Sequence, residues 1–159
     1  WELWTFSFDA AWVKWSGYNS PYGTGNINSY VIGSNNHEAR FKDIPVAKFG
    51  LEKMFPREGS WVKSLAGRAG YIYHPSPVPD QTGDSNFVDN DRHTFSAGFG
   101  LGMKNPWKES DLIDVDFFTQ YNWLVRREIR KASALNVGAP GYATGGKILI
   151  YGAGLTLKF

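Results

Sequence analysis

Apolar and polar residues alternate one by one along several long stretches of this chain. Because successive side chains of a β-strand point to opposite faces of a sheet, an alternation of period two predicts a strand with one apolar face. The clearest case is 113–117, where Ile113, Val115 and Phe117 alternate with Asp114 and Asp116. Related patterns cover roughly 3–15, 39–54, 61–73, 93–103, 113–125 and 149–159. The sequence therefore predicts an all-β fold of about six strands.

The connections between these predicted strands differ in length in a regular way. Long segments rich in Gly, Asn, Asp, Ser and Pro cover 16–38, 75–92 and 131–146, whereas short segments cover 55–60 and 104–110. In an antiparallel sheet this order places every long connection at one end. Membrane β-barrels sort their connections in the same way, with short periplasmic turns and long outer loops. The pattern thus predicts a segment of an antiparallel transmembrane β-barrel.

Composition narrows the alternatives. The chain has no cysteine, which excludes a disulfide scaffold, a thiolate metal site and a cysteine nucleophile. Its 17 Lys and Arg against 15 Asp and Glu do not indicate a nucleic-acid partner. The mean hydropathy is −0.36, and no stretch approaches the run of about 18 apolar residues that a transmembrane helix needs. Hydropathy averages do not detect barrel strands, because lipid-facing and lumen-facing residues alternate along them.

Aromatic residues make up 16% of the chain. In a barrel they are expected at the two membrane interfaces, whereas in a soluble β-sandwich, the alternative, they would fill the core. We expect Trp61, Trp107 and Phe159 near the periplasmic interface and Trp12, Trp15, Tyr71, Tyr73, Tyr121 and Trp123 near the outer one.

Several short motifs carry a resemblance to a known family. They are WVKWS at 12–16, FKD at 41–43, RAGY at 68–71, DNDRH at 89–93 and SAG at 96–98, together with Ser76, Pro77, Val78 and Pro79. The most specific of these are the SPVP motif at 76–79 and the DxDR motif at 89–92, which contains Asp89, Asp91 and Arg92. Over essentially all of 1–159, the chain resembles the C-terminal part of the FadL family, outer-membrane transporters of long-chain fatty acids and aromatic hydrocarbons.

This resemblance implies a barrel of about 14 strands in the bacterial outer membrane, plugged by an N-terminal hatch. Hydrophobic molecules would pass through it passively and leave sideways into the membrane, without a cofactor. Residues 1–159 would supply about six C-terminal strands, while the hatch and about eight earlier strands would be absent. Fewer than about eight strands do not close a membrane barrel, so we expect the remaining strands to come from the same or another chain.

The polar sides of the predicted strands carry charges that suit a hydrophilic lumen. These charges are expected to form cross-strand pairs that fix the register. A ligand-binding role is the second interpretation, in which one lumen cation meets the carboxylate of a fatty acid beside apolar side chains. The candidates are Lys48 and Arg68 for the carboxylate and Phe118, Leu124, Ile148 and Ile150 for the tail. Separately, Leu155, Leu157 and Phe159 resemble the C-terminal assembly signal of outer-membrane barrels.

The loops offer further candidates. Arg126, Arg127, Arg130 and Lys131 form a basic run that either meets lipopolysaccharide phosphates or is simply solvated. The segment 76–79 either shapes the outer mouth or only restricts the unfolded chain. The segment 89–92 is expected to form a local ion pair. The predicted partners are thus membrane lipid, lipopolysaccharide and a hydrophobic small molecule.

Two residue sets have the types that a hydrolase needs, but we expect no catalytic site. They are His74, Ser76 and Asp80, and Asp91, His93 and Ser96. The prolines at 75, 77 and 79 extend the backbone and turn the first set in different directions. Asp84, Asp89 and Asp91 match no standard calcium loop, so no metal is expected. The predicted function is passive uptake of hydrophobic small molecules, with a structural or scaffold barrel in an envelope complex as the alternative.

Overall fold

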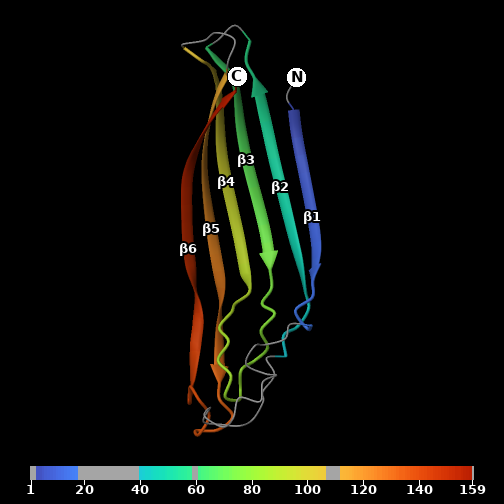
Figure 1. The fold of residues 1–159 in the computed structure, drawn as a ribbon, viewed down its shortest axis with the longest axis vertical. Helices are drawn as coiled ribbons and strands as arrows, with labels where there is room; N and C mark the ends of the chain where they lie inside the picture. Colours follow the sequence, from blue (N-terminus) through green and yellow to red (C-terminus); the bar gives the residue numbers. More distant parts are fainter. Residues whose placement is uncertain (1–2, 18–39, 59–60, 107–111, 159) are drawn as a thin grey trace.

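A computed structural model of the chain describes residues 3–17, 40–58, 61–106 and 112–158. These residues form one antiparallel sheet in which each strand pairs with the next along the chain (Figure 1). The strands are β1 (Leu3–Val13), β2 (Ile44–Pro56), β3 (Val62–His74), β4 (Arg92–Lys104), β5 (Leu112–Arg130) and β6 (Gly141–Lys158). The predicted all-β class, antiparallel pairing and six strands are confirmed.

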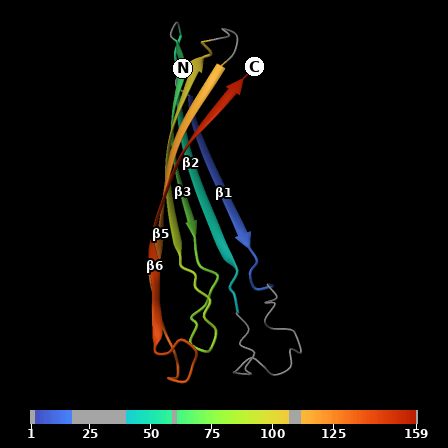
Figure 2. The same ribbon diagram turned by 60° about the vertical axis from the view of Figure 1, so that its left-hand side comes forward.

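The sheet is a single open layer. Within the described part of the chain, β1 pairs only with β2 and β6 only with β5, so the two edges do not meet. Figure 2, turned by 60°, shows the strands sharing one twist along their length. Among the described residues, no helix is long and apolar enough to cross a membrane.

Large apolar side chains gather on one side of this layer, here called the aromatic face. The register aligns Phe8, Phe49, Tyr71 and Phe95 across four strands. Their ring centroids lie 4.9, 6.4 and 5.2 Å apart from one pair to the next. Exposure is high, reaching 77% for Phe6 and 81% for Tyr151. The face also includes Trp4, Trp12, Leu51, Tyr73, Phe99, Phe117, Tyr121, Trp123, Leu149, Leu155 and Leu157.

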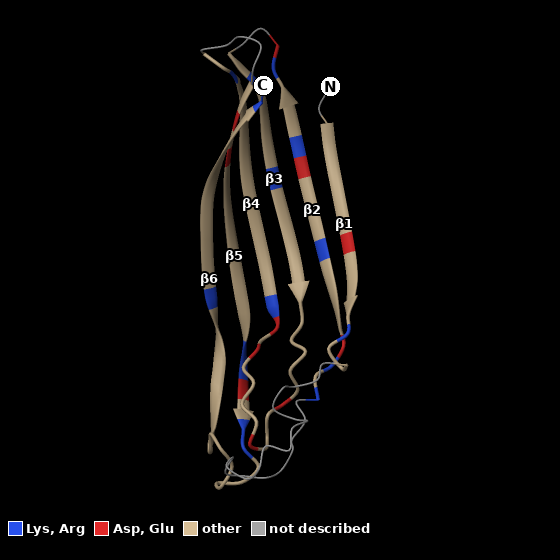
Figure 3. Ribbon diagram, viewed as in Figure 1, with Lys and Arg blue, Asp and Glu red and all other residues tan. Residues whose placement is uncertain are grey.

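The opposite side, here called the polar face, carries mostly small, polar and charged residues, together with a few apolar ones such as Phe118, Ile148 and Ile150. Figure 3 marks the charged residues of both faces along the strands. Those in polar-face register positions are Asp9, Lys48, Glu52, Arg68, Arg92, Lys104, Asp114, Asp116 and Lys158. The strict alternation within each strand is therefore the cause of the two unlike faces.

The last strand begins earlier than predicted. The connection after the fifth strand is expected over 131–146, and β5 does end at Arg130, but β6 begins at Gly141, inside the expected loop. A register shift between Leu124 and Arg127 separates the two parts of this ladder. Gly141 has a φ of 140°, and a Cβ there would lie 2.1 Å from the Ile129 carbonyl oxygen. Glycine thus permits the close backbone approach, and this extension was mistaken for loop because it is glycine-rich.

The start of β2 also differs, since it begins at Ile44 rather than near Ala39. Pro45 lies inside the strand, where it pairs with Trp12 of β1. The pairing of β2 with β3 begins only at Ala47 and Tyr73, so Pro45 lies where β2 has a single partner strand. A proline is tolerated there because no second ladder needs its missing N–H.

The strand bounds place the connections 14–43, 75–91 and 131–140 at one end of the sheet, here called the long-loop end, and 57–61 and 105–111 at the other. Residues 18–39 of the first connection lie outside the described residues, as do Trp107 and Phe159. Trp61 precedes β3 and is exposed.

Candidate functional site

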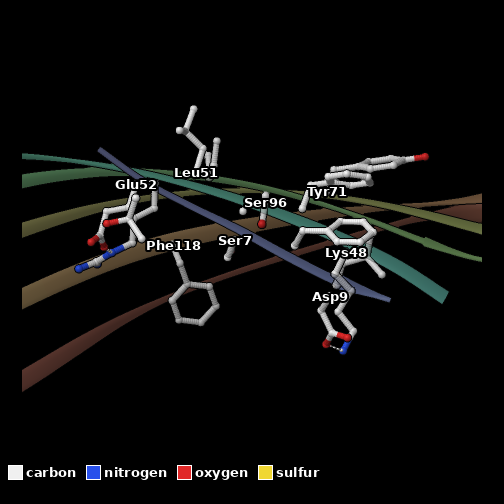
Figure 4. Close-up of a pocket in the computed structure, with 18 residues that line it drawn as sticks. Ser7, Asp9, Lys48, Leu51, Glu52, Tyr71, Ser96 and Phe118 are labelled. Atoms are coloured by element: carbon white, nitrogen blue, oxygen red, sulfur yellow. Dashed lines mark hydrogen bonds and ion pairs between the residues drawn. The ribbon is translucent and has the colours of Figure 1, made fainter. Parts of the chain in front are cut away.

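A groove of about 630 Å³ runs across the polar face from β1 to β5 (Figure 4). Its floor is made by small residues, because the register places glycine or serine at successive strands: Ser7, Gly50, Gly70, Ser96 and Gly98. Figure 4 shows Phe118, Lys48 and Glu52 projecting to this side, whereas Leu51 and Tyr71 project to the other. The alternation of large and small residues therefore hollows this face.

An ion pair lies at each end of the groove. At one end, Nζ of Lys48 is 2.9 Å from Oδ2 of Asp9. At the other end, Nε of Arg68 donates to Oε2 of Glu52 and Nη1 donates to Oδ1 of Asp116, each at 2.5 Å. The pairs join β1 to β2, β2 to β3 and β3 to β5, which agrees with the predicted role of these charges in fixing the register.

Glycines in β4 allow Arg68 to reach β5. Gly98 is the register partner of Arg68, and a Cβ there would lie 3.5 Å from Cβ of Arg68. A Cβ at Gly100 would lie 2.8 Å from Oδ1 of Asp116 and 3.1 Å from Nη1 of Arg68. A larger residue at position 100 would therefore occupy the space between the two charged groups.

Phe118 is the large apolar side chain that lines the groove from β5. Its ring lies over Gly152 of β6, where a Cβ would meet Cζ at 2.6 Å. The structure thus brings together three candidate ligand residues, Lys48, Arg68 and Phe118. Leu124, Ile148 and Ile150 are not part of the groove lining, although Ile148 and Ile150 lie next to it in the β5–β6 ladder, opposite Asn122 and Gln120.

Both candidate cations are already engaged by carboxylates. The charged groups around the groove are two cations, Lys48 and Arg68, and three carboxylates, those of Asp9, Glu52 and Asp116. The groove therefore has no excess positive charge that would attract the carboxylate of a ligand. The groove offers small polar atoms and a ring rather than an unpaired cation. This arrangement suits an uncharged hydrophobic ligand better than the carboxylate of a fatty acid.

Buried polar contacts stiffen the sheet beside the groove. Thr94 and Asn122 are 4% and 5% exposed, and the Thr94 hydroxyl donates to Oδ1 of Asn122 at 2.8 Å. Nε2 of Gln120 donates to the same oxygen at 3.1 Å. The contacts link β4 to β5 through side chains as well as through the backbone ladder.

The motif residues of the 75–91 loop contact one another at the long-loop end. The backbone N–H of Ser76 donates to Oδ1 of Asp91 at 2.7 Å, and the Ser76 hydroxyl accepts from the N–H of Val78. The Asn90 side chain donates to the Val125 carbonyl and to the Thr144 hydroxyl, both at 2.9 Å. Pro77 accepts a backbone hydrogen bond from Lys42. The loop is therefore attached to β5, to β6 and to the segment before β2.

Two members of the predicted basic run hold this loop. Arg127 donates to the Val78 carbonyl at 2.7 Å and to the Asp80 carboxylate at 2.8 Å. Lys131 donates to three carbonyls, those of residues 81, 83 and 85, at 2.7 to 2.8 Å. Burial lowers the pKa of Lys131 below its ordinary value, while the Asp84 carboxylate opposes the shift. Arg126 pairs with Glu128.

The neighbouring motifs meet at the same end. The Ser16 N–H donates to Oδ1 of Asp43 at 2.8 Å, and this hydrogen bond lowers the pKa of the Asp43 carboxyl below its ordinary value. The Phe41 ring lies 6.1 Å from Trp15 and 5.2 Å from Phe87. Trp15, expected at the outer interface, thus lies against Phe41, which in turn contacts Phe87 of the 75–91 connection.

Members of the two candidate triads contact residues outside their own sets. Ser76 and Asp91, which belong to different sets, contact each other. Nδ1 of His93 is 2.7 Å from the Tyr71 hydroxyl on the aromatic face. Among the described residues no group of three His, Cys, Asp or Glu side chains is arranged to hold a metal ion. Asp84 instead accepts hydrogen bonds from Asn136 and Val137.

Sequence reasoning missed the loop-holding roles of Arg127, Lys131 and Asn90, and the bridging role of Gly100. The signal for Gly100 was present as the run of alternate glycines at 98, 100 and 102, which marks a crowded polar face. Leu155 and Leu157 of the predicted assembly signal lie exposed on the aromatic face, while Phe159 lies outside the described residues. No protein-family model, curated protein or solved structure matches the chain.

Proposed function

We propose that this sheet is part of a transmembrane β-barrel of the bacterial outer membrane, with its aromatic face against hydrocarbon and its polar face toward a water-accessible bore. The observation that carries the proposal is the contrast between the faces. On the aromatic face, rings such as those of Phe6 and Tyr151 are more than three-quarters exposed. Such an apolar surface is unfavourable in water and favourable in contact with lipid.

The open edges support the same proposal. In hydrocarbon, every backbone group needs a partner, so β1 and β6 require further strands from the same or another chain. The resemblance to the FadL family suggests a barrel of about 14 strands, which is wide enough to enclose the groove. The long-loop end would face outward.

The bore would admit hydrophobic small molecules by passive passage. The groove supports this role because its small floor, the Phe118 ring and its compensated charges form a site for an uncharged or weakly polar molecule. Long-chain fatty acids remain in the proposed substrate class, with their tails rather than their carboxylates in the groove. No covalent step is required.

Uptake by cells producing the intact protein tests this proposal. We expect faster entry of the neutral probe naphthalene and of oleate than in cells lacking the protein. Ser96→Trp, which fills the groove floor, should reduce entry at least fivefold, whereas Ala153→Trp, on the aromatic face and outside the groove lining, should not. Equal entry with and without the protein would refute the transport role, and a heat-modifiability gel would show that both variants fold.

A scaffold barrel in an envelope complex is the second candidate. Leu135 is 94% exposed and Val137 is 58% exposed on a connection that is hydrogen-bonded to the 75–91 loop. An apolar patch on a fixed platform suits a protein partner. Crosslinking from position 135 in intact cells would identify such a partner. A substitution at Val137 that abolishes the crosslink but leaves uptake unchanged would show that partner binding is separate from transport.

A further inference from the structure

The two faces differ in how their charges are compensated. On the polar face, Asp9, Glu52 and Asp116 each contact Lys48 or Arg68, and Asp114 contacts Lys158. On the aromatic face, the described positions of the ladders up to the register shift in β5 hold two lysines, Lys53 and Lys147, and no Asp or Glu. This face is therefore cationic wherever it is charged.

The two lysines have different surroundings. Nζ of Lys53 packs over the rings of Trp4 and Phe55, at 4.6 and 4.7 Å from their centroids. Lys147 is exposed and is the register partner of Trp123. Beyond Trp123 the same row continues to His93 and Tyr73, with ring centroids 5.5 and 5.0 Å apart. Lys147 thus ends a row of side chains that each combine an apolar body with a polar tip.

The height of Lys147 is set by β6. The outward positions from Leu149 to Leu157 are uncharged, so Lys147 follows the last of them toward the long-loop end. Ten residues separate Lys147 from Leu157. At about 3.3 Å per residue and a tilt of about 40°, this separation corresponds to roughly 25 Å of membrane height, the thickness of a barrel's apolar band. Lys147 therefore lies at the margin of that band.

We propose that Lys147, beside the indole of Trp123, binds a phosphate of lipopolysaccharide in the leaflet at the long-loop end. The inference rests on the proposed membrane function and names a lipid partner for the aromatic face. A lysine ammonium at this margin pairs with headgroup phosphate as a point charge, while its stem lies along apolar surface. Three of the four cations of the basic run are already engaged, because Arg127 and Lys131 donate to loop carbonyls and Arg126 pairs with Glu128, which leaves only Arg130 of that run as a competing site.

Titration of the detergent-solubilised intact protein with bis-phosphorylated lipid A, followed by native mass spectrometry, tests the proposal. Lys147→Gln should weaken binding about fivefold, the effect of one lysine near an anionic lipid surface, and Lys147→Arg should restore it. Lys53→Gln is the matched control and should leave the affinity unchanged. With dephosphorylated lipid A, wild type and Lys147→Gln should bind equally weakly.

Three outcomes would overturn the proposal. They are unchanged lipid A binding by Lys147→Gln, full binding of dephosphorylated lipid A, and equally tight binding of phosphatidylglycerol, which would assign the site to a phospholipid. Naphthalene uptake, measured on the same variants, should be normal for Lys147→Gln. Failure of this inference with normal uptake leaves the transport proposal standing, whereas wild-type protein that does not enter membranes removes both.

Discussion

Arg68 on β3 contacts the carboxylate of Asp116 on β5 across the full width of the intervening strand. The same guanidinium contacts Glu52 on β2, so one side chain ties together residues of three strands. Its path over β4 exists because position 100 has no side chain. Sheet register in this protein is thus held by a bridge longer than a neighbouring-strand pair.

Replacing Gly100 by valine should break this bridge. The new side chain would begin 2.8 Å from Oδ1 of Asp116, which displaces the carboxylate. We expect a loss of about 1–2 kcal/mol in the free energy of unfolding, because the charged groups are partly exposed and partly screened. Urea unfolding of the intact protein in lipid vesicles measures it.

A control for this prediction lies on the aromatic face. Gly67→Val places the same side chain where nothing lies within 4 Å, so its effect on unfolding should be smaller. In an Asp116→Asn background, Gly100→Val should cost less than in wild type. Equal costs in both backgrounds would show that the damage comes from crowding rather than from the bridge.

Lys131→Met should loosen the 75–91 loop. The substitution keeps a long apolar stem but removes the ammonium that donates to three carbonyls. We expect the protection of amides in 81–86 against hydrogen exchange to fall about tenfold, equivalent to about 1.4 kcal/mol. Arg130→Met, at an exposed neighbouring position, is the control and should leave this protection unchanged.

The Thr94 hydroxyl should contribute to stability through Asn122. Thr94→Val keeps the shape of a side chain that is 4% exposed but removes the donor to Oδ1 of Asn122. A cost of about 1–2 kcal/mol in unfolding free energy is expected. Thr119→Val on the aromatic face, whose hydroxyl bond to Ile150 is longer at 3.3 Å, should change stability by less than about 0.5 kcal/mol. Comparable losses at both positions would contradict this assignment.

The contact between Ser16 and Asp43 should depend on pH. Because the hydrogen bond lowers the folded pKa of Asp43, its contribution is present above the unfolded value and is lost as the pH falls through the folded pKa. The amide resonance of Ser16 should therefore titrate with a midpoint below the ordinary aspartate value. In Asp43→Asn this titration should disappear; its persistence would assign the signal to another group.

Alternation was sufficient to predict the strands and their faces. Ile113, Val115 and Phe117 on one side of β5 and Asp114 and Asp116 on the other require only the period of a strand, which is local information. The partner of Asp116 is not local, since the reach of Arg68 depends on the register of β3, β4 and β5 together. The sequence therefore predicted that charges of adjacent strands would pair, but it did not predict the longer bridge from Arg68 to Asp116.

The long-loop end shows the opposite balance. Gly141 and Gly145 indicated a loop, yet both lie in β6. The positive φ of Gly145 lies at the register shift opposite Arg126, and that of Gly141 permits the close approach to Ile129. Arg127 and Lys131 looked like surface charges because sequence cannot show which carbonyls surround a cation. The groove was predicted only in part, because Lys48, Arg68 and Phe118 share it while the residues that hollow it are small and carry no chemical signature.

The sequential order of the strands has a consequence for assembly. Each hairpin is complete once two consecutive segments meet, and its free edge then templates the next segment, so contacts of long sequence separation are never needed to start. The sheet can thus form by adding one strand at a time at either edge. If the sheet closes into the proposed barrel, its two outermost hydrogen-bonding edges would be the last to find partners, so ring closure would complete assembly.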